Sequence, residues 1–243
     1  MAISLNSLDA AVAHAQLLMG KGRKILGLVG KPGSGKSTLA KLLAARLGEK
    51  ARVVPMDGYH LSNKVLRELG CAKRKGAVDT FDALGYTMLL RRIRTEPHSI
   101  IYYPVFHREI EESIAAEGVV SPDVDLVITE GNYLLHPHDN WGGVRELLDE
   151  SWYVDVGDDV RIERLVQRRL AHGNTREEAI HWSTGSDEVN AQVIGKTRPF
   201  ADVIAPYTLG LISAPNLSSA WGAPQNVGHA PRGNGLRRTG GRP

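Results

Sequence analysis

The sequence predicts an α/β fold in which a five-stranded parallel sheet is flanked by helices. Short apolar segments alternate with longer segments whose apolar residues recur at helical spacing, which is typical of βαβ units. The hydrophobic content of 42% in 243 residues is sufficient for the core of one such domain. The expected strands are KILGLVG (24–30), RVVPMD (52–57), DLVITEG (125–131), WYVDV (152–156) and ADVIA (201–205).

Helical periodicity marks most of the segments between these strands. The expected helices cover residues 5–19, 36–47, 63–69, 81–94, 140–150, 158–171 and 175–194. Gly185 is a weak point in the last of them because glycine lowers helix propensity. SIIYYPVF (99–106) is a candidate for one further strand.

The end of the chain differs in composition from the rest. Residues 205–243 contain 7 Gly, 5 Pro and four arginines but no acidic residue, which is typical of low-complexity sequence. The rest of the chain carries 26 basic and 27 acidic residues. We therefore expect a folded domain at 1–204, with a helical lid at about 158–175, and a disordered basic tail at 205–243. Because the positive charge belongs to the tail, we expect no nucleic-acid binding by the folded body.

The N-terminal segment and the cysteine content favour a cytoplasmic protein. Residues 1–20 lack a basic region and interrupt their apolar residues with polar ones, unlike a signal peptide. No apolar run approaches the roughly 18 residues that span a bilayer, so no membrane contact is expected. Cys71 is the single cysteine, which excludes an intrachain disulfide and fits a reducing compartment. A homodimer is compatible with these features.

A glycine-rich turn joins the first expected strand to a helix. GKPGSGKS (30–37) fits the pattern G-x-x-x-x-G-K-[ST] in the strand–turn–helix context that this motif requires. Glycines let backbone N–H groups surround a phosphate, Lys36 can reach its oxygens, and the Ser37 hydroxyl can bind Mg²⁺. The turn therefore predicts binding of ATP with Mg²⁺. The expected nucleotide-binding residues of the turn are Gly30, Lys31, Pro32, Gly33, Ser34, Gly35, Lys36, Ser37 and Thr38.

Two acidic residues follow other strands of the expected sheet. Asp57 comes after VVPM and Glu130 after LVIT, and ligands of open α/β sheets bind beyond the carboxyl ends of the strands. Asp57 is the candidate base for an acceptor hydroxyl, with a simple Asp-Gly turn as the alternative. Glu130 is a candidate ligand of Mg²⁺ together with Ser37. Asp125 lies at the other end of the same strand, some 16 Å away, and is excluded.

Four arginines lie on the helix expected after WYVDV. Arg161, Arg164 and Arg168 share one helical face, and Arg169 adjoins it. Such a face can close over phosphates and neutralise the charge that develops during transfer, with a solvated basic face as the alternative. We expect Arg164 and Arg168 to act in catalysis with Lys36, and Arg161 and Arg169 to bind the nucleotide.

Five segments together resemble one family of kinases. They are the phosphate-binding turn, VPMDGYHL (54–61), KGAVDTFDALG (75–85), VITEGNYLL (127–135) and DVRIERLVQRRLAHG (159–173). In order and spacing they are similar to the phosphoribulokinase/uridine kinase/pantothenate kinase group of P-loop kinases, and to its bacterial nucleoside- or fructose-kinase-like branch. The resemblance covers about residues 20–204 and implies a P-loop NTPase fold.

The resemblance also implies roles for the matching positions. Asp57 matches the family's catalytic acid, Glu130 matches the acid that ends its Walker-B-like strand, and the arginines match those of the lid. The residues implied to line the acceptor pocket are Tyr59, His60, Phe81, Arg108 and Asn190. His107 departs from the family pattern, in which aspartate often follows the aromatic residue.

Two classes of function agree with these features. The first is an ATP-dependent kinase that phosphorylates a hydroxyl of a small metabolite, and the second is an NTP-dependent switch or assembly ATPase that acts with a protein partner. The sequence has no NKxD-like guanine signature, which argues against a GTPase. A base beside the phosphate turn favours the kinase. Its acceptor stays open, because a nucleoside, a sugar such as fructose and a pantothenate-like alcohol all suit a carboxylate base.

Overall fold

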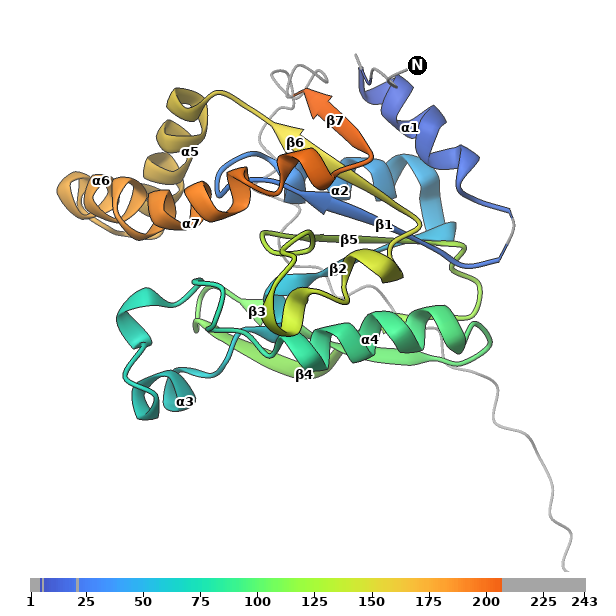
Figure 1. Ribbon diagram of the computed structural model, residues 1–243, viewed down its shortest axis with the longest axis horizontal. Helices are drawn as coiled ribbons and strands as arrows, with labels where there is room; N and C mark the ends of the chain where they lie inside the picture. Colours follow the sequence, from blue (N-terminus) through green and yellow to red (C-terminus); the bar gives the residue numbers. More distant parts are fainter. Residues whose placement is uncertain (1–4, 6, 21, 207–243) are drawn as a thin grey trace, which may run out of the picture. The chain divides into compact units, whose positions relative to one another are not determined.

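The structure of the protein is a computed structural model that describes residues 5, 7–20 and 22–206 (Figure 1). The predicted tail lies outside the described residues except for Ala205 and Pro206. These two residues belong to the last strand, β7 (Val203–Pro206), so the folded part extends past the predicted boundary at 204. No helix in the described ranges combines the length and the apolar character needed to cross a membrane.

The five predicted parallel strands are confirmed, and they form one sheet in the order β2–β5–β1–β6–β7 (Figure 1). Besides β7 they are β1 (Lys24–Val29), β2 (Ala51–Pro55), β5 (Leu126–Gly131) and β6 (Glu150–Asp155). The register pairs Val29 of β1 with Gly131 of β5, and Pro55 of β2 with Glu130. The carboxyl ends of β1, β2 and β5 therefore lie side by side, and the segments that follow them share one edge of the sheet.

Apolar layers cover both faces of this sheet. The helices that form them are α1 (Leu8–Leu17), α2 (Lys36–Leu47) and α4 (Ala83–Thr95). Leu26 and Leu28 of β1 are buried in the cluster that contains residues of α1 and α2, whereas Ile25 and Val29 are buried in the cluster that contains residues of α4. Strand β1 is thus buried on both faces, as the central strand of a parallel sheet should be. This rigid centre carries the phosphate-binding turn.

The candidate strand at 99–106 belongs to a separate hairpin. Strand β3 (Ile101–His107) pairs antiparallel with β4 (Glu112–Val120), and the two form their own sheet. The sequence does not predict strand β4, because its central residues 114–117, I-A-A-E, are exposed and lack a clear apolar alternation. The tip of the hairpin brings Arg108 to the carboxyl end of β2.

The helix predicted at 140–150 is wrong. The segment forms two 3₁₀ turns, Asp139–Trp141 and Arg145–Leu147. Gly142 and Gly143 lie between them and disfavour a continuous helix. Trp141 is buried, and its indole N–H donates to the Val78 carbonyl at 3.0 Å, so tertiary packing replaces the helical hydrogen bonds.

The predicted helices at the end of the domain are confirmed, including their interruption. They are α5 (Asp158–Ala171), α6 (Arg176–Thr184) and α7 (Ser186–Gly195), with Gly185 between the last two. Thr175 and Glu178 form a reciprocal capping box at the start of α6. These three helices lie together at one end of the sheet, and the short helix α3 (Asn63–Glu68) lies apart from them (Figure 1).

Candidate active site

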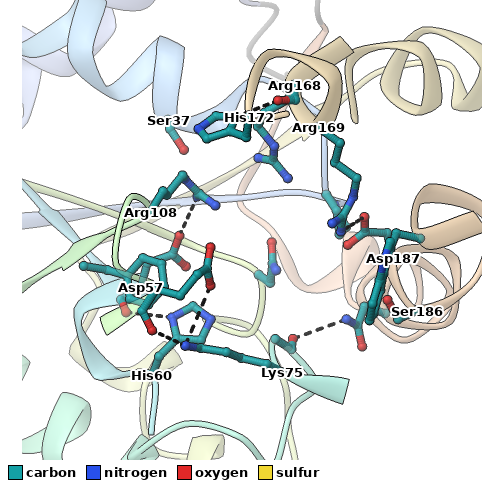
Figure 2. Close-up of a pocket in the computed structure, with 18 of the residues that line it drawn as sticks. Ser37, Asp57, His60, Lys75, Arg108, Arg168, Arg169, His172, Ser186 and Asp187 are labelled. Carbon is teal, nitrogen blue, oxygen red and sulfur yellow. Dashed lines mark hydrogen bonds and ion pairs between the residues drawn. The ribbon is translucent and has the colours of Figure 1, made fainter. Parts of the chain in front are cut away.

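A cavity of about 450 Å³ opens at the carboxyl ends of β1, β2 and β5. Twelve residues singled out from the sequence line it: Pro32, Gly33, Lys36, Ser37, Asp57, His60, Phe81, Arg108, Glu130, Arg168, Arg169 and Asn190. The phosphate-binding turn, the residues after β2 and β5, the hairpin tip and the helices α5 to α7 all contribute (Figure 2). The parallel register thus brings together residues that are far apart in the sequence.

The phosphate-binding turn has the backbone that its glycines allow. Gly33 and Gly35 have φ angles of 80° and 93°, in the left-handed region that favours glycine. A Cβ atom on Gly33 would lie within 2.4 Å of the Arg161 carbonyl oxygen, so α5 packs directly on the turn. The Ser34 hydroxyl is buried without a hydrogen-bond partner in the structure. The turn therefore contains an unused polar group where a phosphate would bind.

Lys36 is the first residue of α2 and lines the cavity as a half-buried cation. Among the described residues, none accepts a hydrogen bond from its ammonium group. Burial lowers the pKa of Lys36, while Glu130 and Asp57 act in the opposite direction. An anionic ligand at the turn would pair with the Lys36 ammonium group and favour its charged form.

Asp57 lies in the 3₁₀ turn Met56–Tyr59 that follows β2. Its Oδ2 is 3.1 Å from Nη2 of Arg108. Burial raises the pKa of Asp57, but the nearby cations Arg108, Lys36 and Arg168 act in the opposite direction, and the pKa lies below its ordinary value. Asp57 is therefore an ionised carboxylate at neutral pH, with its other oxygen available to a hydroxyl.

Glu130 lies at the end of β5, beside the phosphate-binding turn. The Ser37 hydroxyl donates to its Oε1 at 3.0 Å. Burial and the nearby Asp57 carboxylate raise the pKa of Glu130 above its ordinary value. The pKa values of Asp57 and Glu130 are thus driven apart, which separates the chemical roles of these two carboxylates.

The arginines of α5 divide into two pairs. Arg168 and Arg169 line the cavity. Arg169 pairs with Asp187 of α7 at 3.0 Å and stacks on Trp182, whereas no acid or carbonyl within the described ranges holds the Arg168 guanidinium. Burial lowers the pKa of Arg168, and Arg108 adds to the effect. Arg168 is the lid cation best placed to meet an anion.

Arg161 and Arg164 do not line the cavity, contrary to the sequence prediction for the shared face. The side chain of Arg161 is fully buried, with Nε 2.6 Å from Asp158 and Nη2 paired with Glu188 of α7. Arg164 donates to the Gly33 carbonyl at 3.4 Å. Lys31 likewise turns away and pairs with Asp158 at 2.9 Å. These side chains fix α5 against the phosphate-binding turn and α7.

The other wall of the cavity is aromatic and polar. The His60 ring lies between Phe81 and Phe106, with centroid distances of 4.1 and 4.6 Å. Asn190 of α7 lines the same cavity and donates to the Gly76 carbonyl at 3.3 Å. Tyr59 lies outside it, against Tyr86 of the core, so the predicted pocket role of Tyr59 is not matched by its position.

Several lining residues escaped the sequence analysis. They are Phe106, Glu111, Asn132, Trp182 and Asp187. Asn132 lies two positions after Glu130, so its place at the sheet edge could have been found, whereas the others depend on the hairpin and on the packing of α6 and α7. His107 points away from the cavity and pairs with Glu117 at 2.6 Å. Of these neighbouring hairpin residues, Phe106 and Arg108 line the cavity and His107 does not.

The residues present fit a nucleotide with a divalent cation. A bound phosphate suits the unpartnered Ser34 hydroxyl, the left-handed Gly33 and Gly35 and the half-buried Lys36. No group of three or more His, Cys, Asp or Glu side chains in the described part of the chain could hold a metal alone. Mg²⁺ requires no such group, because one or two protein oxygens and phosphate oxygens suffice.

The fold and this cavity define a P-loop phosphotransferase whose donor turn faces a carboxylate. The chain belongs to the phosphoribulokinase/uridine kinase family, whose model matches residues 25–206. It is therefore a small-molecule kinase by class.

Named relatives agree with this class. A protein of Schizosaccharomyces pombe, provisionally named uridine kinase C227.14, is 32% identical over 78% of this chain and 85% of its own length. The uridine kinase of Lactobacillus helveticus is 30% identical over 78% of this chain and 90% of its own length. A crystal structure from Silicibacter sp. TM1040, provisionally named a fructose transport system kinase, is 37% identical with a TM-score of 0.76. It covers 82% of this chain and 99% of that one.

Proposed function

We propose that the protein transfers the γ-phosphate of Mg-ATP to a hydroxyl group of a small metabolite, with Asp57 as the base. The observation that carries the proposal is the ionised Asp57 carboxylate, held by Arg108, in the same cavity as Lys36 and Ser37 of the phosphate-binding turn. Phosphoryl transfer to a hydroxyl needs a carboxylate beside the acceptor and cations beside the donor. This cavity offers both.

Each group then has one role. Asp57 orients the acceptor hydroxyl and takes its proton, and Arg108 keeps the carboxylate ionised and in place. Lys36 and Arg168 stabilise the negative charge on the transferred phosphate. Ser37 and Glu130 would hold Mg²⁺, which supplies charge neutralisation on the phosphates when bound.

A nucleotide-dependent switch or assembly ATPase is the alternative proposal. Such a protein positions water and depends on a macromolecular partner, so it has no need of an acceptor wall. The wall built from His60, Phe81 and Phe106 beside Asp57 favours the kinase.

The experiment is a panel of hydroxyl acceptors with Mg-ATP, scored as ADP release above the background hydrolysis and as phosphorylated product. The panel contains a nucleoside (uridine), a sugar (fructose) and a pantothenate-like alcohol (pantothenate). Asp57→Asn should lower transfer to the preferred acceptor by about 10²–10⁴-fold, the usual share of a general base. Asp79→Asn is the matched control, since Asp79 pairs with Arg74 at the surface. Near-normal transfer by Asp57→Asn contradicts the base, and turnover that needs a protein partner favours the alternative.

A further inference from the structure

The hydrogen bonding of His60 fixes which of its ring atoms faces the cavity with a free lone pair. Its Nδ1 lies 2.7 Å from the carbonyl oxygen of Asp57. A carbonyl oxygen only accepts hydrogen bonds, so Nδ1 carries the hydrogen and Nε2 of the neutral ring is an acceptor. Within the described part of the chain, no residue hydrogen-bonds to this Nε2, although the ring lines the cavity. Figure 2 shows His60 beside Asp57 and below Arg108.

The surroundings of His60 keep the ring neutral. Burial lowers the pKa of His60, and the cations Lys75 and Arg108 add to this effect. The Asp57 carboxylate and the bond to its carbonyl act in the opposite direction but do not outweigh burial. The ring therefore offers an acceptor, not a donor, to a ligand at neutral pH.

A second unpartnered acceptor lies in the same cavity. Asn132 Oδ1 is buried and has no hydrogen-bond partner in the structure. A buried polar atom without a partner is unfavourable, so such atoms are normally paired. His60 Nε2 and Asn132 Oδ1 are both acceptors, so they suit a ligand that donates hydrogen bonds, as hydroxyl groups do.

Two cations on the acceptor side, Arg108 and Lys75, are already engaged, while Lys73 lines the cavity with an exposed side chain. Arg108 pairs with Asp57, and the Lys75 ammonium donates to Asn63 Oδ1 at 2.8 Å and to the Glu111 carbonyl. Lys75 also lies over the Phe106 ring, 5.1 Å from its centroid. A carboxylate on the acceptor would therefore have to displace an existing ion pair or hydrogen bond before it met Arg108 or Lys75.

We propose that the acceptor is a polyol, and that His60 Nε2 accepts a hydrogen bond from a second hydroxyl near the one that receives the phosphate. This inference rests on the proposed function, because Asp57 is taken to hold the reacting hydroxyl. His60 donates to the carbonyl of that same residue, so one substrate can contact both groups. The aromatic stack of Phe81, His60 and Phe106 suits the apolar C–H face of a sugar. Either a free sugar or the ribose of a nucleoside has this chemistry.

The test compares substrates and variants in one cycle. Fructose, ribose, uridine and pantothenate are assayed first, and the monodeoxy analogues of the best polyol follow. His60→Phe removes both nitrogens but keeps a ring between Phe81 and Phe106, and His60→Gln restores an acceptor. The kcat/KM of each protein is measured on the parent polyol and on each analogue.

The expected result is loss of discrimination at one hydroxyl. Wild-type protein should favour the parent over one deoxy analogue by about 10–100-fold in kcat/KM, as a paired hydroxyl contributes. His60→Phe should reduce this ratio to below about threefold, and His60→Gln should restore part of it. The ratio cancels any loss that the missing Nδ1 bond imposes on all substrates alike. Fructose or ribose as the best acceptor identifies a free sugar, and uridine identifies a nucleoside.

Two results overturn the inference and leave the proposed function standing. One is an equal fall in kcat/KM on the parent and on every analogue in His60→Phe. The other is a higher kcat/KM on pantothenate, which carries a carboxylate, than on every neutral polyol. If the wild-type protein phosphorylates no acceptor, or if Asp57→Asn keeps its activity, the proposed function fails and this inference fails with it.

Discussion

Arg108 Nη2 lies 3.1 Å from Asp57 Oδ2, and this ion pair joins the tip of the β3–β4 hairpin to the end of β2. Both side chains are about one-third exposed, so the pair lies at the mouth of the cavity and not in the core. The ion pair therefore contributes little to the free energy of folding, since partly exposed pairs are weak. It matters more for the chemistry of the cavity, because Arg108 favours the ionised form of Asp57.

Arg108→Gln should move the acid limb of the kcat/KM profile to higher pH. Arg108 lowers the pKa of Asp57, so its removal raises that pKa and the carboxylate is protonated over a wider acidic range. The kcat/KM at neutral pH should also fall, by about 10-fold or more, because Asp57 loses its partner. Initial rates with the best acceptor, measured from neutral pH down to about pH 3, test this directly, because the ordinary pKa of an aspartate is about 3.9.

Arg108→Lys is the matched variant for this prediction. It keeps the positive charge but loses the guanidinium geometry. Its acid limb should stay near that of the wild-type protein even if kcat/KM falls. An acid limb that shifts equally in both variants, or in neither, would show that Arg108 does not control the ionisation of Asp57.

Gly33→Ala should abolish tight nucleotide binding. Gly33 has a φ of 80°, and a Cβ there would lie 2.4 Å from the Arg161 carbonyl oxygen, so the turn and α5 have to separate. Gly22→Ala is the control, because Gly22 has a φ of 82° but no heavy atom within 4 Å of the added Cβ. Titration with a fluorescent ATP analogue should give a dissociation constant at least about 10-fold higher for Gly33→Ala only. If both variants bind the ATP analogue with similar affinity, close packing of the turn on α5 is not needed for nucleotide binding.

The parallel sheet could be predicted because each of its strands is marked by a short pattern of neighbouring residues. Continuous apolar runs such as KILGLV and LVIT identify buried strands, and the turn after the first strand carries its own chemical pattern. The shared location of Asp57, Glu130 and Lys36 could be predicted because the carboxyl ends of parallel strands lie at one edge of the sheet. They do lie around one cavity, where their roles stand as proposals.

The acceptor wall was harder to predict because its residues come together through packing. Phe106 and Arg108 reach the cavity on a hairpin whose second strand has no clear alternation, and Trp182 reaches it only when α6 packs beside α5. Helical spacing does not predict where the side chain of Arg161 lies. The spacing places Arg161 on the same face as Arg168, but two acidic residues hold its side chain away from the cavity.

Arg161→Met should destabilise the protein without removing a residue that lines the cavity. Arg161 joins Asp158 of α5 to Glu188 of α7, and its side chain is fully buried. Methionine fills a similar volume but leaves Glu188 without Arg161 and Asp158 with Lys31 alone, which should cost about 2 kcal/mol because these acids remain partly exposed to water. Urea unfolding followed by circular dichroism measures the loss.

Arg46→Met is the control for that measurement. Arg46 pairs with Asp9 at 2.6 Å, but both side chains are exposed. Its loss should cost no more than about 0.5 kcal/mol. Equal destabilisation by the two substitutions would refute a stabilising role for the buried link between α5 and α7.

Glu130→Gln should stabilise the ligand-free protein while it weakens the use of Mg²⁺. Burial and Asp57 raise the pKa of Glu130 in the folded state, so the native protein binds more protons than the unfolded chain as Glu130 titrates. Stability therefore falls as pH rises from the ordinary glutamate range through the folded pKa, and the ionised side chain is unfavourable at neutral pH. Glutamine removes this cost and should add roughly 0.5–2 kcal/mol, the size of a typical stabilising substitution.

The same substitution should raise the Mg²⁺ concentration needed for half-maximal rate by about 10-fold, since an amide oxygen is a weaker ligand than a carboxylate. The amide oxygen of the introduced glutamine can still accept the Ser37 hydrogen bond, so binding of ATP in EDTA should stay unchanged. Urea unfolding at pH 4 and pH 7.5 without ligands, together with Mg²⁺ titration of the rate, separates the two effects. The gain in stability should be present at pH 7.5 and shrink towards pH 4. A variant that is less stable at both pH values, or that needs no more Mg²⁺ than the wild-type protein, would remove Glu130 from the proposed metal site.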